Sequence, residues 1–177
     1  MDIQLKAKCS VKQKSNMNLA LYKDVKREYV DAVKQYENQI AASDQPVLDD
    51  FINLSFLYWS FAAQQMEFNI PNMIPDEWSL IGGQRFSVII EMGLARYPNS
   101  VELTFWRQYF PYRLFDADFP ESDCEKILSN YGRQQSLVPY FYLHLFDDLK
   151  YSEEINFLLE ICNRTPTAKN LYIRSFL

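Results

Sequence analysis

One histidine and three cysteines are the side chains of this chain best suited to nucleophilic or metal chemistry. His144 lies in the apolar stretch YFYLHLF, a setting typical of a histidine packed in or at the edge of a core. A cysteine or serine nucleophile needs an imidazole within hydrogen-bond reach. No spacing in the sequence brings His144 to Cys124 or Cys162. An enzyme built on His144 is therefore the least favoured interpretation.

A bound metal ion or cofactor is not predicted either. A zinc site needs three or four Cys or His ligands with close pair spacing, and these residues are scattered along the chain. Residues 116–118 (DAD) resemble the start of a calcium loop. That loop needs a ligand, a glycine and a glutamate at the positions held here by Pro120, Glu121 and Ile127.

Three pairs of adjacent carboxylates stand at or near predicted helix ends. They are Asp49 and Asp50, Asp147 and Asp148, and Glu153 and Glu154. The first and third pairs fall in the first turn of a predicted helix, where the positive end of the helix dipole stabilises negative charge. Because the dipole accounts for them, general acid–base catalysis by these pairs is not favoured.

A run of acidic residues between positions 116 and 125 contains no lysine or arginine. Its members are Asp116, Asp118, Glu121, Asp123 and Glu125. Two interpretations stay open. The run is either a solvated loop with the start of a helix, or an electrostatic landing site for a basic protein, whose association such charge accelerates. The carboxylates of residues 147–154 would extend the run if two helical hairpins stack there.

The charge of the chain is unevenly distributed. Residues 1–34 hold eight Lys or Arg and four Asp or Glu, whereas the other 143 residues hold ten basic and nineteen acidic side chains. The main body therefore lacks the basic footprint of a nucleic-acid-binding domain, and direct binding of nucleic acid is not predicted. An acidic body is typical of a soluble protein, and it also suits a basic partner.

The compartment predicted from the sequence is the cytoplasm. The N-terminus lacks the apolar run of a secretory signal. The most apolar stretch, residues 54–63, is shorter than the roughly 20 residues that span a bilayer. Three scattered cysteines favour reduced thiols over a disulfide framework, and no membrane contact is predicted.

Aromatic residues and helical periodicity dominate the main body. The chain holds 13 Phe, 12 Tyr and 3 Trp, most of which must lie in a core, because a monomer cannot leave so much apolar area exposed. Apolar residues recur every three or four positions from Tyr22 to Ile40, which predicts one helix of about five turns. Residues 47–66 are apolar on several faces, which predicts a central helix packed from both sides.

Further helices are predicted along the rest of the chain, separated by short turns that favour antiparallel neighbours. They cover residues 75–97, 100–115, 120–131 with a stop at Gly132, 137–147, a helix capped by Ser152, and a last helix opened by Thr165 and Pro166. Residues 68–74 are expected to form a loop. The Gly82-Gly83 pair marks a break, a bend or a close helix crossing. No phosphate-loop motif surrounds this pair.

The N-terminal residues follow a different pattern. Apolar and polar residues alternate over residues 1–11, which is a strand signal. A lone strand has no partner in a helical chain, so this segment is interpreted either as a disordered or loosely docked tail or as an ordered extended segment. The predicted organisation is a tail at 1–18 and one all-α domain at 19–177.

The segment RYPNSVELTFWRQYF (residues 96–110) resembles helical repeats of the half-a-tetratricopeptide type. Pro98 stands at the turn, and Trp106 and Tyr109 lie one helical turn apart, as in those repeats. The match covers about residues 86–110, and the remainder lacks a 34-residue period. The resemblance implies an all-α fold of about four antiparallel helical hairpins, stacked into a short right-handed superhelix.

The whole chain resembles the small cytoplasmic immunity proteins encoded beside bacterial polymorphic or contact-dependent toxins. The resemblance is carried by FINLSFLYWSF (residues 51–61), RYPNSVELTFWRQYF (96–110), LVPYFYLHLF (137–146) and TPTAKNLYIRSFL (165–177). It implies a non-enzymatic protein that binds a cognate toxin, such as a basic nuclease domain, and neutralises it by occlusion.

The residues expected to contact that partner are those of the acidic run, from Asp116 to Glu125. The basic N-terminal tail departs from the class and would fit a different binding mode. The alternative function is a tetratricopeptide-like adaptor that holds a peptide or partner protein in the groove of its superhelix.

Overall fold

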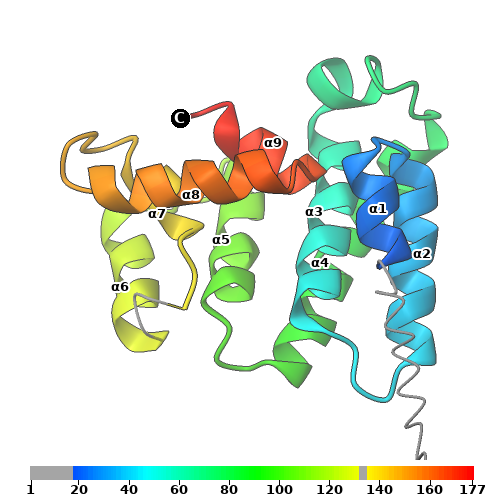
Figure 1. Ribbon diagram of the computed structural model, residues 1–177, viewed down its shortest axis with the longest axis horizontal. Helices are drawn as coiled ribbons and strands as arrows, with labels where there is room; N and C mark the ends of the chain where they lie inside the picture. The colour runs from blue at the N-terminus through cyan, green and yellow to red at the C-terminus, as the bar shows by residue number, and fades with distance from the viewer. Residues whose placement is uncertain (1–17, 132–134) are drawn as a thin grey trace, which may run out of the picture.

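The computed structural model describes residues 18–131 and 135–177, and every regular element in them is helical (Figure 1). The elements are α1 (Leu19–Val25), α2 (Tyr29–Ala42), α3 (Leu48–Ala63), the π-helical turn η1 (Gln65–Asn69), α4 (Glu77–Arg96), α5 (Val101–Phe115), α6 (Glu121–Tyr131), α7 (Pro139–Leu143), α8 (Ser152–Arg164) and α9 (Ala168–Arg174). The all-α prediction is confirmed, and the described residues hold nine α-helices against about eight expected. The alternating residues 1–11, nearly all of the predicted tail and Gly132 lie outside the described residues.

Helices α2 to α6 stand side by side, each running opposite to the helix before it (Figure 1). This is the antiparallel hairpin arrangement that the short connections predict. Helix α8 instead runs across the direction of the others, and α9 packs against α3. Among the described residues, no helix combines the length and the apolar character needed to cross a membrane.

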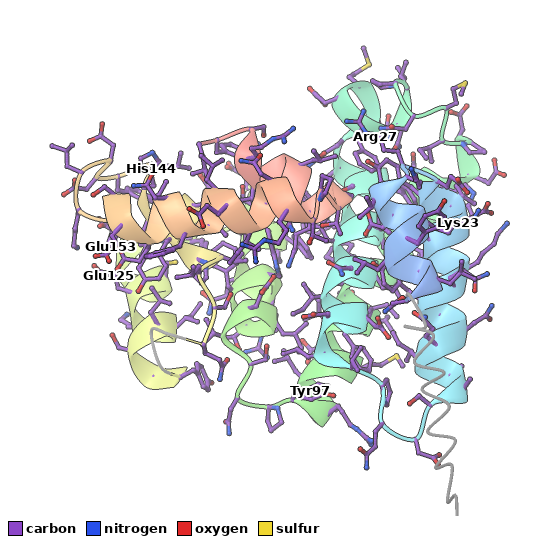
Figure 2. All side chains as sticks on the ribbon, viewed as in Figure 1. Lys23, Arg27, Tyr97, Glu125, His144 and Glu153 are labelled. Carbon is purple, nitrogen blue, oxygen red and sulfur yellow. The ribbon has the colours of Figure 1, made fainter. Side chains whose placement is uncertain are left out.

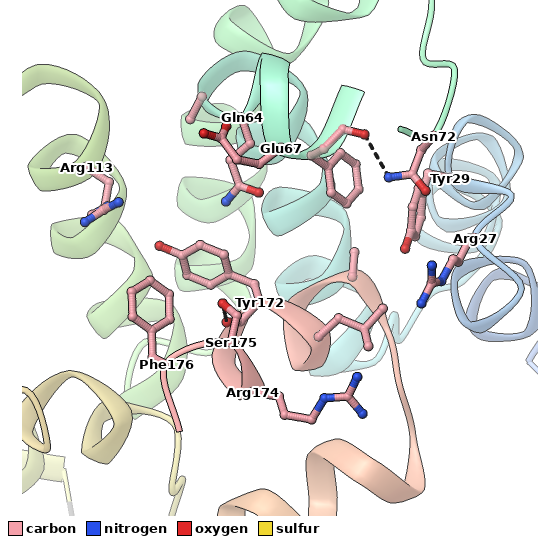
Figure 3. Close-up of a pocket in the computed structure, with 14 residues that line it drawn as sticks. Arg27, Tyr29, Gln64, Glu67, Asn72, Arg113, Tyr172, Arg174, Ser175 and Phe176 are labelled. Atoms are coloured by element: carbon pink, nitrogen blue, oxygen red, sulfur yellow. Dashed lines mark hydrogen bonds between the residues drawn. The ribbon is translucent and has the colours of Figure 1, made fainter. Parts of the chain in front are cut away.

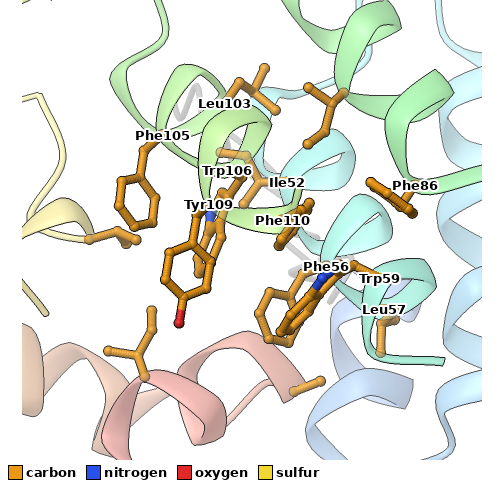
Figure 4. Packing of buried hydrophobic residues seen from close by; sticks show 14 of the residues in the cluster. Ile52, Phe56, Leu57, Trp59, Phe86, Leu103, Phe105, Trp106, Tyr109 and Phe110 are labelled. Carbon is orange, nitrogen blue, oxygen red and sulfur yellow. The ribbon is translucent and has the colours of Figure 1, made fainter. Parts of the chain in front are cut away.

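Helix α3 is the centre of the core, as predicted. All twelve residues from 50 to 61 are buried, so that every face of this helix is covered by protein. The ring of Trp59 stacks on that of Phe110 with centroids 4.9 Å apart, and Phe56 meets Trp106 edge-on at 5.3 Å (Figure 4). Trp106 and Tyr109 are fully buried, so the aromatic residues of the 96–110 segment pack α5 onto α3.

The single helix predicted from Tyr22 to Ile40 is wrong, because the chain breaks between α1 and α2. Arg27 has φ 62°, a left-handed conformation that ends α1. The face of α1 that is buried carries Ala20 and Asp24, whereas Tyr22 is 37% exposed. The apolar spacing of Tyr22, Val25 and Tyr29 continues across the break without interruption. The spacing therefore could not reveal the turn.

Two of the predicted helix starts are displaced. Helix α9 is capped by Thr167, whose hydroxyl accepts a hydrogen bond from the backbone N–H of Asn170 at 3.3 Å, and not by Thr165. Ser152 is the first residue of α8 rather than its cap. Ser100 caps α5, accepting from the Leu103 N–H at 3.2 Å, at the start predicted from the sequence.

A buried carboxylate joins the first and last helices. Asp24 is 1% exposed. Its Oδ1 accepts a hydrogen bond from the backbone N–H of Ala168 at 2.7 Å, and its Oδ2 accepts from the Tyr36 hydroxyl at 3.2 Å. Burial raises the pKa of Asp24 to about 7, although both hydrogen bonds and the nearby Lys169 act in the opposite direction. Helices α1, α2 and α9 therefore meet at one ionisable group.

The Gly82-Gly83 pair lies inside α4 and marks a close helix crossing, one of the three possibilities that the sequence leaves open. A Cβ atom on Gly82 would lie 2.3 Å from the Tyr58 carbonyl oxygen and 3.0 Å from Phe61 Cβ. A Cβ atom on Gly83 would meet only Ala62 Cβ, at 3.9 Å. Gly82 therefore lets α4 approach the backbone of α3, and Gly83 does not share this role.

Replacing Gly82 with Ala is expected to destabilise the fold by about 1–3 kcal/mol or more, because backbone atoms cannot move aside for the new methyl group. Gly83→Ala is the matched control. It should stabilise the fold by about 0.5–1 kcal/mol, since alanine is the better helix former and the space is open. Urea unfolding followed by circular dichroism measures both changes. Equal effects of the two substitutions would contradict the close crossing.

Asp24→Asn should remove a pH-dependent contribution to the free energy of unfolding. The pKa of Asp24 is about 7 in the folded protein, against 3.8 for an ordinary aspartate. Well below pH 3.8 the group is protonated in both states, and as the pH rises toward 7 the ionised unfolded state is increasingly favoured. The free energy of unfolding of the variant, minus that of the wild type, should therefore rise by roughly 4 kcal/mol between pH 4 and pH 8. Urea unfolding at several pH values checks this, and a pH-independent difference would contradict it.

Candidate partner-binding surface

The acidic run lies at the junction of α5 and α6, and its carboxylates fall into two groups. Asp116 ends α5 in a left-handed conformation with φ 55°, Asp118 is exposed, and Glu121 begins α6. Among the described residues, these three side chains have no hydrogen-bonding or ion-pair partner. Asp123 forms an ion pair with Lys126, with Lys126 Nζ 2.7 Å from Asp123 Oδ1. Glu125 accepts hydrogen bonds from Lys150 and Tyr151. Asp116, Asp118 and Glu121 are therefore the carboxylates most available to a partner.

The turn between α7 and α8 packs beside the acidic run. Glu125 on α6 accepts a hydrogen bond from Lys150 Nζ at 2.8 Å and another from the Tyr151 hydroxyl at 2.8 Å. The Tyr142 ring stacks on Phe119 with centroids 4.8 Å apart. Its hydroxyl donates a hydrogen bond to the Phe119 carbonyl. The 147–154 segment thus comes to the same end of the molecule as α6, where Figure 2 shows Glu125 and Glu153.

The charge at this end is strongly negative. Residues 116–131 and 147–154 together hold nine carboxylates and two lysines, Lys126 and Lys150. Asp147 accepts hydrogen bonds from the backbone N–H groups of Leu149 and Lys150, at 3.2 and 3.0 Å, which fixes the turn. The side chain of Asp147 is therefore partly occupied, whereas Asp148, Glu153 and Glu154 have no hydrogen-bonding or ion-pair partner among the described residues, like the three carboxylates at the junction of α5 and α6.

Exposed apolar side chains accompany these carboxylates. Phe115 is 67% exposed and Leu149 is 80% exposed, and about half of Leu145 and of Phe146 is also in solvent. The Phe146 ring contacts Tyr142 with centroids 5.2 Å apart, and Tyr142 in turn stacks on Phe119 beside Asp118. We name this region the acidic–apolar surface. It consists of Phe115, Asp116, Asp118, Glu121, Leu145, Phe146, Asp147, Asp148 and Leu149.

The sequence pattern missed the apolar part of this surface. One helix is predicted over residues 137–147, but α7 ends at Leu143. Beyond that point the chain turns, and about half of the Leu145 and Phe146 side chains is exposed to solvent. The sequence signal that could have indicated a solvated turn at this point is the pair of carboxylates, Asp147 and Asp148, that directly follows the apolar residues.

The candidate nucleophiles are poorly suited to catalysis. Cys124 is buried, and its thiol donates a hydrogen bond to the Pro139 carbonyl oxygen, with the sulfur 3.7 Å from the oxygen. Burial raises the pKa of Cys124 well above the usual range. Burial also raises the pKa of Cys162 to about 11. Both thiols are therefore protonated at neutral pH, whereas the thiolate is the reactive form. His144 Nδ1 is buried without a hydrogen-bond partner in the described part of the chain.

The best-shielded ion pair of the described residues joins α5 to α9. Lys169 Nζ lies 2.6 Å from Glu102 Oε1, and both side chains are only 13% exposed. Glu102 also accepts hydrogen bonds from Trp106 Nε1 at 3.3 Å and from Ser136 Oγ at 3.1 Å. This network lines a cavity of about 540 Å³. Since the two charges compensate each other, the network ties the helices together and offers no free acid or base.

No metal centre is found in the residues that the structure describes, where no three His, Cys, Asp or Glu side chains are placed to hold an ion together. Comparison with protein-family models, with curated proteins and with solved structures finds no match to this chain. The resemblances to helical repeats and to immunity proteins therefore stay predictions.

Proposed function

We propose that this protein is a non-enzymatic immunity protein, which binds a cognate toxin domain in the cytoplasm and neutralises it by occlusion. The observation that carries the proposal is the acidic–apolar surface. Asp116, Asp118 and Glu121 lack partners in the described residues, and they lie next to large apolar side chains in solvent.

The composition of this surface supports a protein partner. Protein interfaces combine a buried apolar centre with a polar rim, and aromatic residues supply much of their binding energy. Phe115, Phe146 and Leu149 provide the apolar area. The surrounding carboxylates provide long-range attraction that steers a basic protein toward the surface and orients it.

Occlusion is the mechanism that follows from this chemistry. A toxin that acts on nucleic acid carries lysines and arginines where the phosphates bind. The carboxylates of Asp116, Asp118 and Glu121 would occupy those cations in place of phosphate, and the apolar side chains would exclude water from the contact. Inhibition of this kind needs no catalytic group, which agrees with the protonated thiols of Cys124 and Cys162.

Charge reversal tests the electrostatic part of the proposal. The triple variant Asp116→Lys, Asp118→Lys, Glu121→Lys should slow association with the toxin domain encoded by the adjacent gene by about tenfold or more at low salt. The difference from the wild type should shrink as ionic strength rises, because exposed charges are screened. Surface plasmon resonance at several salt concentrations measures both effects.

The matched control reverses three exposed carboxylates elsewhere, with the substitutions Asp44→Lys, Glu77→Lys and Glu91→Lys. It changes the net charge by the same amount and should slow association much less. If both triple variants slow association equally, the acidic–apolar surface is not the landing site. If the adjacent gene encodes no toxin, and no toxin domain binds with micromolar or better affinity, the proposed function itself is excluded.

Leu149→Ala tests the apolar part. The Leu149 side chain is 80% exposed, so its truncation should leave the free energy of unfolding almost unchanged. Affinity for the toxin domain should fall by roughly tenfold, because truncation removes an apolar contact that is buried in the complex. Leu80→Ala on α4, at a leucine that is 69% exposed, is the control and should leave the affinity unaltered. Calorimetric titration measures the affinities. Unchanged binding by Leu149→Ala would remove this side chain from the interface.

A further inference from the structure

A second feature of the molecule is a cavity of about 610 Å³ lined by three arginines from distant parts of the chain, with Arg113 on the opposite side from Arg27 and Arg174 (Figure 3). Arg27 lies in the turn between α1 and α2, Arg113 in the last turn of α5, and Arg174 at the end of α9. The cavity opens between these elements and the residues that follow α3. Its volume lies in the range of small-molecule sites, about 300–1,000 Å³.

These three guanidinium groups have no carboxylate partner among the described residues, and the only carboxylate that lines the cavity is the exposed Glu67. Arg174 Nη1 donates a hydrogen bond to Asn163 Oδ1 at 3.1 Å. By contrast, Arg85 lies 2.7 Å from Glu37. Three unpaired arginines around one cavity stand out in a body whose net charge is negative, and with Glu67 they leave a local charge of two positive units.

A buried donor without a partner also lines the cavity. Gln64 Nε2 makes no hydrogen bond within the described residues, although the atom is out of contact with solvent. Leaving a buried donor unsatisfied is unfavourable. The hydroxyls of Tyr172 and Ser175 are already occupied, since Tyr172 and Tyr109 share a hydrogen bond of 2.6 Å and Ser175 Oγ donates to the Tyr172 carbonyl at 2.6 Å. The Gln64 amide and the guanidinium groups therefore leave free donors at the cavity, which suits an anion.

The backbone of Arg27 adds an independent observation. Its φ of 62° is uncommon for a residue with a Cβ atom and is unfavourable by roughly 1–2 kcal/mol. The strain lies in the three-residue break that separates α1 from α2 and places Arg27 at the cavity. Conformations of this kind cluster at binding sites, where the surrounding structure maintains them.

We propose that this cavity binds a small phosphate monoester with an aromatic group. Guanidinium groups bind phosphate oxygens through paired hydrogen bonds, and a phosphate monoester carries close to two negative charges at neutral pH, which balances the local charge. The rings of Tyr172 and Phe176 line the same cavity and are half-buried, and they offer a wall for the aromatic group of the ligand. This site is separate from the proposed toxin-binding function and does not depend on it.

The test uses the full-length protein and phenyl phosphate as the probe, titrated by calorimetry at low ionic strength. Phenyl phosphate should bind at least tenfold more tightly than phenyl sulfate, which carries a single charge, and more tightly than inorganic phosphate, which lacks the ring. The single variants Arg27→Gln and Arg174→Gln should each lower the affinity by about tenfold or more, as expected for loss of a charge-assisted pair.

Arg107→Gln is the control, because Arg107 lies on α5 outside the cavity, 3.9 Å from Glu91, and should leave the affinity unchanged. The three cavity arginines are exposed, and urea unfolding of each variant checks that the fold is retained. Absence of saturable phenyl phosphate binding would overturn the proposal. Binding that survives both the Arg27→Gln and the Arg174→Gln substitutions, or that is equally strong for phenyl sulfate, would overturn it as well.

Discussion

The complete enclosure of α3 is the constraint on which the rest of the fold depends. A helix with twelve consecutive buried residues needs neighbours on every side. Helix α4 covers one side at a close distance that Gly82 permits, and α5 covers another through Trp106 and Phe110. Helix α9 closes a further side, where Tyr172 meets Trp59 with ring centroids 5.3 Å apart. The abundance of aromatic residues follows from this demand for large buried side chains.

Closing the core around α3 also decides where charge is placed. Asp24 is buried where α1, α2 and α9 meet, and Glu102 and Lys169 are shielded between α5 and α9. The remaining charges separate over the surface. Carboxylates collect at the junction of α5 and α6, whereas Arg27, Arg113 and Arg174 surround one cavity. The two features adjoin at the end of α5, so that opposite charges stand close together without neutralising each other.

Much of the fold was predictable, because burial on several faces leaves a clear sequence signal, as in residues 47–66. The break at Arg27 was not predictable. Glycine and asparagine are the usual sequence signals of a left-handed residue, and this position holds an arginine. Phe146 was expected in a helix that runs to residue 147, but α7 ends at Leu143, and about half of the Phe146 side chain is exposed. The acidic run was visible from composition, and Asp123 pairs with Lys126 at a local i,i+3 spacing. The partners of Glu125, Lys150 and Tyr151, come from contacts that the sequence does not encode locally. The three arginines of the cavity are 86 and 61 residues apart, a distance at which no pattern connects them.

Amide hydrogen exchange of the protein, alone and in complex with the proposed toxin domain, decides whether the acidic–apolar surface is the interface. On this account, exchange slows on binding in residues 115–121 and 144–151, which carry the exposed carboxylates and apolar side chains. Exchange in α2 and in the first half of α4 stays the same, since neither contributes to that surface. Slower exchange confined to α2 and α4, with residues 115–121 and 144–151 unchanged, would contradict the assignment.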